Sequence, residues 1–269
     1  MKKYKILVLS DLKNSAVNTL KSAVSLAKMI NGQIAFFYVK NPTDIVEREN
    51  QLSANRTINK EHINVDKKIQ NLINPIRDEY SIKIDHSFTF GNLKIEIEAY
   101  IKEHQPDIIV LGKRKSKSLN FVGDNMTQFV LDKHDGVIML ATNKNHLEPN
   151  HEISLGVLNS YEDLFNLDFS ANLIDHIQEP LKSFKIVKNS KVIEKPKLPE
   201  DKKTVEYVFE QNDNTVKNIS TYLNKNNINL LFVNRDEKNT NQDADFINSD
   251  IKEIINKTNV SLLLTGRQN

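Results

Sequence analysis

Short apolar runs recur along this chain and are separated by longer segments in which apolar residues return with a helical period. In the first half the runs cover residues 4–10 (YKILVLS), 33–40 (QIAFFYVK), 106–112 (PDIIVLG) and 136–141 (GVIMLA), and residues 81–90 alternate apolar side chains onto one face. Continuous apolar runs of this length are typical of parallel strands that are covered on both faces. Their alternation with helices predicts an α/β fold.

The segments between these runs predict four helices. A helix after Asn14 or Ser15 ends at Asn31, the polar segment 44–79 is helical and ends near Pro75, and two shorter helices follow Asn92 and Asp124. The predicted inner residues are Val17, Leu20, Val24 and Ala27 in the first helix, and Ile95 and Ala99 in the third, with Ile97 as a further candidate. On the strand 81–90, His86 is predicted to be a hydrogen-bonded core histidine.

Five strands alternating with four helices predict a doubly wound parallel five-stranded sheet. Right-handed crossovers make 3-2-1-4-5 the economical strand order. Asp11, after the first strand, and Gly112, after the fourth, would then lie side by side at the switch point, where open α/β sheets bind ligands.

The pattern begins again near residue 150, which indicates an internal repeat. Residues 5–11 match 153–159 at an offset of 148, residues 101–115 match 223–237 at 122, and residues 135–141 match 259–265 at 124. The fall from 148 to 122 means that the second copy has lost about 26 residues, which correspond to the helix 44–79. The segment 189–203 (NSKVIEKPKLPEDKK) stands in its place and is predicted to be an exposed loop. We therefore expect two domains, residues 1–145 and a truncated copy at residues 150–269.

Composition restricts the chemistry. The chain has no cysteine, which excludes disulfides and thiolate sites, and its net charge of +2 gives no strong field for nucleic acid. No apolar run reaches the roughly 18 residues of a membrane span, and the start lacks a signal-peptide pattern, so no membrane partner and a cytoplasmic location are expected. The histidines lack metal-ligand spacing, so no metal site is predicted.

Four segments in order resemble the universal stress protein family: KILVLSD at 5–11, Gly91 before a helix, DIIVLGKR at 107–114 and GVIMLA at 136–141. The resemblance covers nearly the whole chain and is stronger in residues 1–142. It implies the doubly wound fold, a role in stress response, and in some members an adenine-nucleotide site. It also implies dimerisation through the last strand of each domain.

The nucleotide-binding members of this family carry Gly, two residues, Gly, nine residues, Gly, then Ser or Thr. Here Gly112 is the first glycine, Lys115 replaces the second, and Gly123 stands two residues early and precedes Asp124. A side chain at position 115 hinders close approach of the backbone to phosphate, and the carboxylate of Asp124 repels it.

The other residues that carry the resemblance fit part of a nucleotide site. Lys113 and Arg114 supply positive charge, and Asp11 and Val39 match the adenine side. The structural alternatives are a helix cap at Asp11 and a solvated charged loop at 113–117. In the second copy Asn159 replaces the acid and Asn234 the first glycine, so no phosphate site is expected there.

Three functions remain open. The first is a non-enzymatic binding or scaffold protein of the universal stress type, and the alternative is an ATP-binding protein with one site in the first domain. The third is an enzyme, such as a slow nucleotide hydrolase. An enzyme needs a placed acid, base or metal ligand, and only Asp11 and Asp124 are candidates, so no catalytic residue is assigned. ATP or another adenine nucleotide is the cofactor of the alternative function, and a protein partner is compatible with the first.

The last strand of each domain also predicts how the copies assemble. Residues 136–141 and 260–265 are apolar and would lie at sheet edges, which must be covered. We predict that they pair antiparallel within the chain and imitate the dimer of the single-domain proteins. The ten-residue linker 143–152 has an extended reach of roughly 33 Å, which spans one edge of a small domain.

Overall fold

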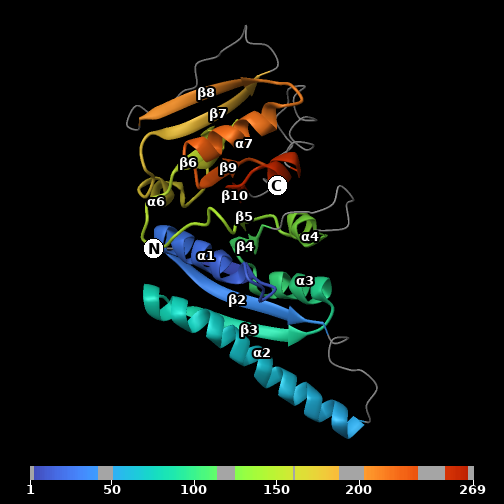
Figure 1. The fold of residues 1–269 in the computed structure, drawn as a ribbon. Coiled ribbons are helices and arrows are strands. Elements are labelled where there is room, and N and C mark those ends of the chain that lie inside the picture. The colour runs from blue at the N-terminus through green and yellow to red at the C-terminus, as the bar shows by residue number, and fades with distance from the viewer. Residues whose placement is uncertain are drawn as a thin grey trace.

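A computed structural model of the chain describes residues 3–41, 51–113, 125–159, 161–187, 203–235 and 252–265. The strands of these segments form one ten-stranded sheet with helices on both faces (Figure 1). The strands are β1 (Tyr4–Leu9), β2 (Gly32–Lys40), β3 (Ile84–Phe90), β4 (Ile108–Gly112), β5 (Val137–Ala141), β6 (Leu155–Leu158), β7 (Leu181–Val187), β8 (Thr204–Glu210), β9 (Leu230–Val233) and β10 (Ser261–Leu264).

The helices connect these strands. They are α1 (Ala16–Ile30), α2 (Gln51–Tyr80), α3 (Leu93–His104), α4 (Asn125–Lys133), α5 (Tyr161–Phe165), α6 (Ser170–Ile174) and α7 (Thr215–Lys225), and residues 252–257 are also helical. Among the described residues, none of these helices combines the length and the hydropathy that crossing a membrane requires.

The strand order of the sheet is β3-β2-β1-β4-β5-β10-β9-β6-β7-β8. Its first half has the predicted order 3-2-1-4-5 with all five strands parallel, which confirms the expected fold class. The second half repeats this order in mirror sequence, with β6 equivalent to β1 and β10 equivalent to β5. The predicted loop 189–203 lies outside the described residues except for Lys203, which precedes β8.

The two halves meet where β5 runs antiparallel to β10. Met139 is opposite Leu263 and Leu140 is opposite Leu262, and all four side chains are fully buried. Every other strand pair in the sheet is parallel. We call the β5–β10 pair the joint. It covers the apolar edge that each half would otherwise expose to solvent.

A hydrophobic core lies on each face of the sheet, and both cores continue across the joint. Helices α1, α2, α5 and α6 contribute to one core, whereas α3, α4, α7 and residues 252–257 contribute to the other. Met139 and Leu263 point into the first core, and Leu140 and Leu262 point into the second. The alternation of strand side chains therefore connects the halves on both faces.

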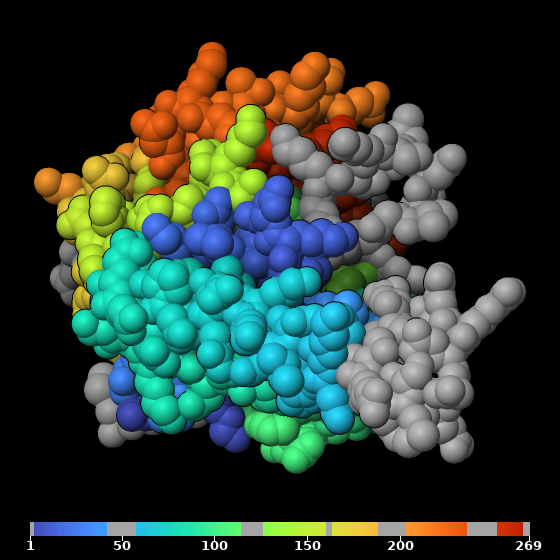
Figure 2. Space-filling view, turned by 60° about the horizontal axis from the view of Figure 1, so that its bottom comes forward, coloured from blue at the N-terminus to red at the C-terminus, as the bar shows by residue number. Residues whose placement is uncertain are grey.

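The linker between the halves packs along one polar stripe of α1. The amide of Asn18 donates to the Asn143 carbonyl (2.9 Å), and the Ser22 hydroxyl accepts from the Leu147 N–H (3.1 Å). Lys28 Nζ is 2.8 Å from Asn150 Oδ1. Figure 2 shows the linker side by side with α1, with α2 along the other side of that helix. The linker is thus a packed element, although its sequence predicted only a connection between the halves.

Two helices differ from their predictions. Helix α2 continues through Pro75 to Tyr80, because Ile73, Ile76 and Tyr80 are buried and this packing outweighs the one hydrogen bond that a proline removes. The N-terminal part of α2 extends beyond the sheet (Figure 1). In α1 the predicted inner residue Val17 is 41% exposed, although Leu20, Val24 and Ala27 are buried as expected.

The predicted inner face of α3 is correct only at Ile97. Ile95 is 66% exposed and Ala99 is exposed, whereas Ile97 and Ile101, one turn apart, face the sheet. The adjacent Tyr100 stacks on Phe37 of β2 with ring centroids 4.1 Å apart. Because this sequence has isoleucines on two faces of α3, only the contact with β2 selects the buried one.

His86 is not a core residue. It lies on β3, which is an edge strand, and its side chain is open to solvent. Its Nε2 is 3.3 Å from Asp66 Oδ1 on α2, so the predicted hydrogen bond exists, but at the surface.

Candidate functional site

The carboxyl ends of β1 and β4 lie at one edge of the sheet, as the predicted strand order requires. Leu9 is opposite Leu111, so Asp11 and Gly112 follow neighbouring strands. A Cβ at Gly112 would be 2.8 Å from Thr19 Oγ1 in the first turns of α1. Glycine therefore lets α1 approach the end of β4 closely.

Asp11 belongs to the turn before α1. Its Oδ1 accepts a hydrogen bond from the Lys13 N–H (3.0 Å), and the Lys13 ammonium lies 4.0 Å from Oδ2. The cap position of the helix is Ser15, whose side chain makes no capping hydrogen bond. The interpretation of Asp11 as the cap of α1 is therefore wrong, because a carboxylate two residues before an N–H closes a local turn of its own.

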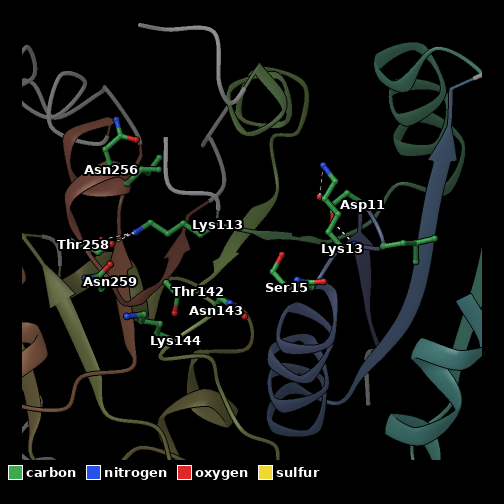
Figure 3. Close-up of a pocket in the computed structure, with 13 residues that line it drawn as sticks. Asp11, Lys13, Ser15, Lys113, Thr142, Asn143, Lys144, Asn256, Thr258 and Asn259 are labelled. Atoms are coloured by element: carbon green, nitrogen blue, oxygen red, sulfur yellow. Dashed lines mark hydrogen bonds and ion pairs between the residues drawn. The ribbon is translucent and has the colours of Figure 1, made fainter. Parts of the chain in front are cut away.

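Lys113 reaches toward the second half of the chain. Its Nζ donates to the carbonyl (2.7 Å) and to the hydroxyl (2.9 Å) of Thr258, directly after the helical residues 252–257. Figure 3 shows this side chain directed away from Asp11. A cation at the end of a helix complements the negative end of the helix dipole. The side chain predicted to bind phosphate thus binds the second half of the protein instead.

The other predicted site residues are not gathered here. Val39 is buried in β2 within the core and does not line the cleft described below. Arg114, Lys115, Gly123 and Asp124 lie outside the described residues.

A cleft of about 820 Å³ lies between the two halves beside Lys113 (Figure 3). Its walls are residues 11–15 before α1, residues 142–144 after β5, and Ile255, Asn256, Thr258 and Asn259 from the second half. Of the predicted site residues, Asp11 and Lys113 line it. The lining has amides, hydroxyls, three lysines and one carboxylate, which are groups suited to hydrogen bonding with a polar ligand.

The equivalent positions of the second half serve structural contacts. Asn159, in place of the acid, has a left-handed backbone (φ 59°), and its Oδ1 accepts from the Ile186 N–H (2.9 Å). Asn234, in place of the first glycine, donates to a carboxylate oxygen of Asp163 and accepts from the Thr265 hydroxyl (2.8 Å).

Arg235 was not among the predicted site residues. It is 7% exposed and crosses the joint, where its guanidinium donates to the carbonyls of Leu131 (3.2 Å), His134 (2.7 Å) and Gly136 (2.6 Å). It also donates to the Thr265 carbonyl of its own half. The guanidinium therefore binds the end of α4 and the turn that follows this helix in the opposite half.

The contacts of Lys113 and Arg235 are related by the internal repeat. The offset of 122 relates Lys113 to Arg235, and the offset of 124 relates His134 to Thr258. Each half thus extends one cation from the end of its fourth strand to the turn before the last strand of the other half. We call the two contacts the reciprocal clasp. The repeat offset of 122 relates Arg235 to Lys113, so this offset was the signal in the sequence that could have identified Arg235.

His134 is enclosed within this clasp. Burial, followed by the nearby Arg235 guanidinium, lowers the pKa of His134 from its ordinary value to about 4. Its Nε2 is buried and has no hydrogen-bond partner among the described residues. The imidazole is therefore neutral at neutral pH.

Comparison with known proteins identifies relatives of the fold. The model of the universal stress protein family matches residues 4–131. The structure of a universal stress protein from Archaeoglobus fulgidus is 11% identical, covers 100% of both chains and has a TM-score of 0.68. A functionally unknown protein from Pseudomonas aeruginosa is 11% identical, with 98% of this chain and 92% of that chain covered and a TM-score of 0.55. No curated protein matches the chain. At these identities the structural likeness concerns the fold, and it extends over both halves.

Proposed function

We propose that the chain is a non-enzymatic binding or scaffold protein of the universal stress type, because the model of that family matches residues 4–131. In this proposal residues 1–145 and 150–269 are two domains that act as one rigid unit. A role in stress response and a cytoplasmic location are further parts of it.

The observation that carries the proposal is the reciprocal clasp. At the position after the fourth strand, the family resemblance implies a loop that cradles phosphate. Here the cation at that position in each half binds backbone carbonyls across the joint. A side chain that is committed to a structural contact must break that contact before it can bind a ligand, which weakens binding by the cost of the lost interaction.

The alternative function is binding of ATP at one site in the first domain. The cleft favours it, because Asp11 and Lys113 both line a space at the carboxyl edge of the sheet. Against it, Val39 on the predicted adenine side does not line that space.

Adenosine separates the two functions, because it carries the adenine and the ribose without phosphate. If the protein is a scaffold without an adenine site, millimolar adenosine leaves its thermal unfolding midpoint unchanged, and ATP with Mg²⁺ is not hydrolysed above the rate in buffer. If the first domain binds adenine nucleotides, adenosine raises the midpoint by mass action. Saturation at one site per chain would then establish the alternative. Two equivalent sites would contradict the expectation that the second copy has no nucleotide site.

A further inference from the structure

Strand β8 lies at the end of the sheet that belongs to the second half (Figure 1). It pairs with β7 on one side, and no strand of the described residues pairs with its outer side. Directly after β8, the Gln211 N–H donates to the Val187 carbonyl (2.9 Å), so the odd-numbered residues of the strand direct their backbone groups toward β7. The backbone groups of the alternate residues, Glu206 and Val208 among them, therefore point outward from the sheet.

The opposite end of the sheet is covered by a helix that the second half lacks among its described residues. Helix α2 packs against β3, where Ile84 is buried and the rings of His62 and Phe88 are in contact (centroids 4.5 Å apart). On β8, Val205 and Val208 are 38% and 39% exposed, one on each face of the strand. The strand also has no lysine or proline, the residues that commonly protect an edge.

Aromatic rings extend the apolar surface at this edge. Tyr207 stacks on Phe184 of β7 and contacts Tyr222 of α7, with ring centroids 5.7 Å and 4.4 Å apart. Tyr207 and Phe209 are half-buried and lie on the same face of β8 as Val205. A strand added to β8 would therefore cover apolar side chains and pair with the outward backbone groups at the same time.

We propose that β8 pairs antiparallel with β8 of a second copy of this chain, so that the sheet continues across a two-fold axis. The strand is seven residues long, and full overlap places Tyr207 opposite Tyr207 of the second copy. In this register Glu206 lies opposite Val208, and Val205 lies opposite Phe209.

The charges of the strand select this register. A slip of two residues in one direction places Glu206 opposite its own counterpart, and a slip in the other direction places it opposite Glu210. Like charges directly opposite each other destabilise an antiparallel pair, and a slip of one residue turns the apolar side chains to the other face. Full overlap is thus the register that avoids opposed carboxylates.

The same register suits the apolar residues. Because Glu206 and Val208 have outward backbone groups, they form hydrogen-bonded pairs, and Val205, Tyr207 and Phe209 form the intervening pairs, whose side chains are closer. Aromatic and β-branched pairs of this kind stabilise a sheet. One strand from each copy buries less surface than a standard interface, so we expect a weak dimer that forms at high micromolar concentration. This inference goes beyond the proposed function, since no residue of β8 lines the cleft.

Two substitutions of Val208 test the pairing, because this side chain is exposed in the single chain and lies opposite Glu206 in the dimer. Val208→Glu opposes carboxylates at both symmetric positions and should raise the dimer dissociation constant about tenfold in sedimentation equilibrium. Val208→Lys faces Glu206 with the opposite charge and should leave the constant equal to that of the wild type or lower it. Both variants should unfold like the wild type at low micromolar concentration, where the chain is a monomer.

Cross-linking tests the register. The chain has no cysteine, so Tyr207→Cys introduces a single thiol, and the Cα atoms of such a close antiparallel pair are about 4.5 Å apart, a separation that a disulfide spans. Oxidised glutathione, which accepts the two electrons, should convert this variant to a covalent dimer. Val205→Cys is the matched control. Because Val205 lies opposite Phe209, its thiol would be roughly 13 Å from its counterpart and should not cross-link.

A chain that remains monomeric at millimolar concentration would overturn the proposal, and this result is expected if another segment of the chain or a different protein covers β8. Equal dissociation constants for the two Val208 variants would mean that the copies associate through another surface. Equal cross-linking of the two cysteine variants would exclude the proposed register.

Discussion

At the scale of single residues, the two cations of the reciprocal clasp differ in how strongly the structure depends on them. Arg235 is buried and donates to the carbonyl oxygens of Leu131, His134, Gly136 and Thr265, whereas Lys113 is half-buried and donates to Thr258. A buried carbonyl that loses its donor keeps the cost of its desolvation. The stability of the joint should therefore depend mainly on Arg235.

Replacement of this guanidinium tests that conclusion. Arg235→Met retains an apolar stem but leaves the carbonyls of the α4 turn without donors, and we expect it to lower the free energy of unfolding by about 3 kcal/mol in urea denaturation. Lys113→Met is the matched variant and should cost about 1 kcal/mol, because its ammonium is partly solvated. Equal losses from the two variants would contradict the asymmetry of the clasp.

His134 predicts a pH dependence of stability. Its folded pKa of about 4 lies below the ordinary value of 6.5, so the unfolded chain binds more protons between these values. Stability from this residue is complete above pH 6.5 and falls as the pH drops toward 4. One pKa unit corresponds to about 1.4 kcal/mol, so the loss is on the order of 3 kcal/mol across this interval.

The comparison of the wild type with His134→Gln measures this effect. Unfolding in urea at several pH values should give a steeper decline for the wild type between pH 6.5 and 4, since glutamine does not titrate. Parallel curves for the two proteins would show that His134 titrates alike in the folded and unfolded states.

At the scale of elements, the linker packs against α1 and covers part of the core of the first half. Its Leu147 is 0% exposed within the core, and the polar residues around it bond to one stripe of α1. Such a segment contributes packing energy, which a flexible tether does not.

Leu147→Ala should therefore lower the free energy of unfolding by about 3 kcal/mol, the range of buried leucine truncations. His151→Ala, an exposed position of the same linker, is the control and should be neutral within about 0.5 kcal/mol. Chemical denaturation of both variants gives the measurement. A neutral Leu147→Ala would mean that the linker is detached from α1 in solution.

At the scale of the whole molecule, one sheet and two continuous cores connect the halves. The buried pair of Met139 and Leu263 lies at the centre of this connection. The protein should therefore unfold in one cooperative transition and tumble as a single compact chain. Halves that tumble independently by NMR relaxation would exclude this arrangement.

Leu263→Lys tests the connection directly, because it places an unpaired ammonium within the joint. We expect a loss of about 3 to 5 kcal/mol, with a melting curve that broadens or separates into two transitions. Met139→Lys should act in the same way from the opposite strand. Val208→Lys on the edge strand β8, where the side chain is 39% exposed, is the control and should melt like the wild type. Unchanged melting of both joint variants would mean that β5 and β10 do not pair in solution.

The sequence by itself determined the elements and their order. Apolar runs mark strands that are buried on both faces, and helical periods mark the helices that cover them. The repeat offsets revealed that this pattern occurs twice. The strand order 3-2-1-4-5 and the proximity of Asp11 and Gly112 followed from handedness rules alone. These properties are local or topological, so one sequence is sufficient to infer them.

Only the tertiary structure decided which side chains meet. Ile97 is buried and Ile95 is not, because α3 turns one of two apolar faces toward Phe37. Lys113 binds Thr258, 145 residues away, and Arg235 binds the turn after α4, contacts that no local pattern encodes. A lysine or arginine looks the same in the sequence whether its side chain binds a phosphate or the end of a helix. Its partner depends on where the carbonyl groups lie in three dimensions. The physical reason is that long-range contacts depend on how whole elements pack, which periodicity along the chain does not specify.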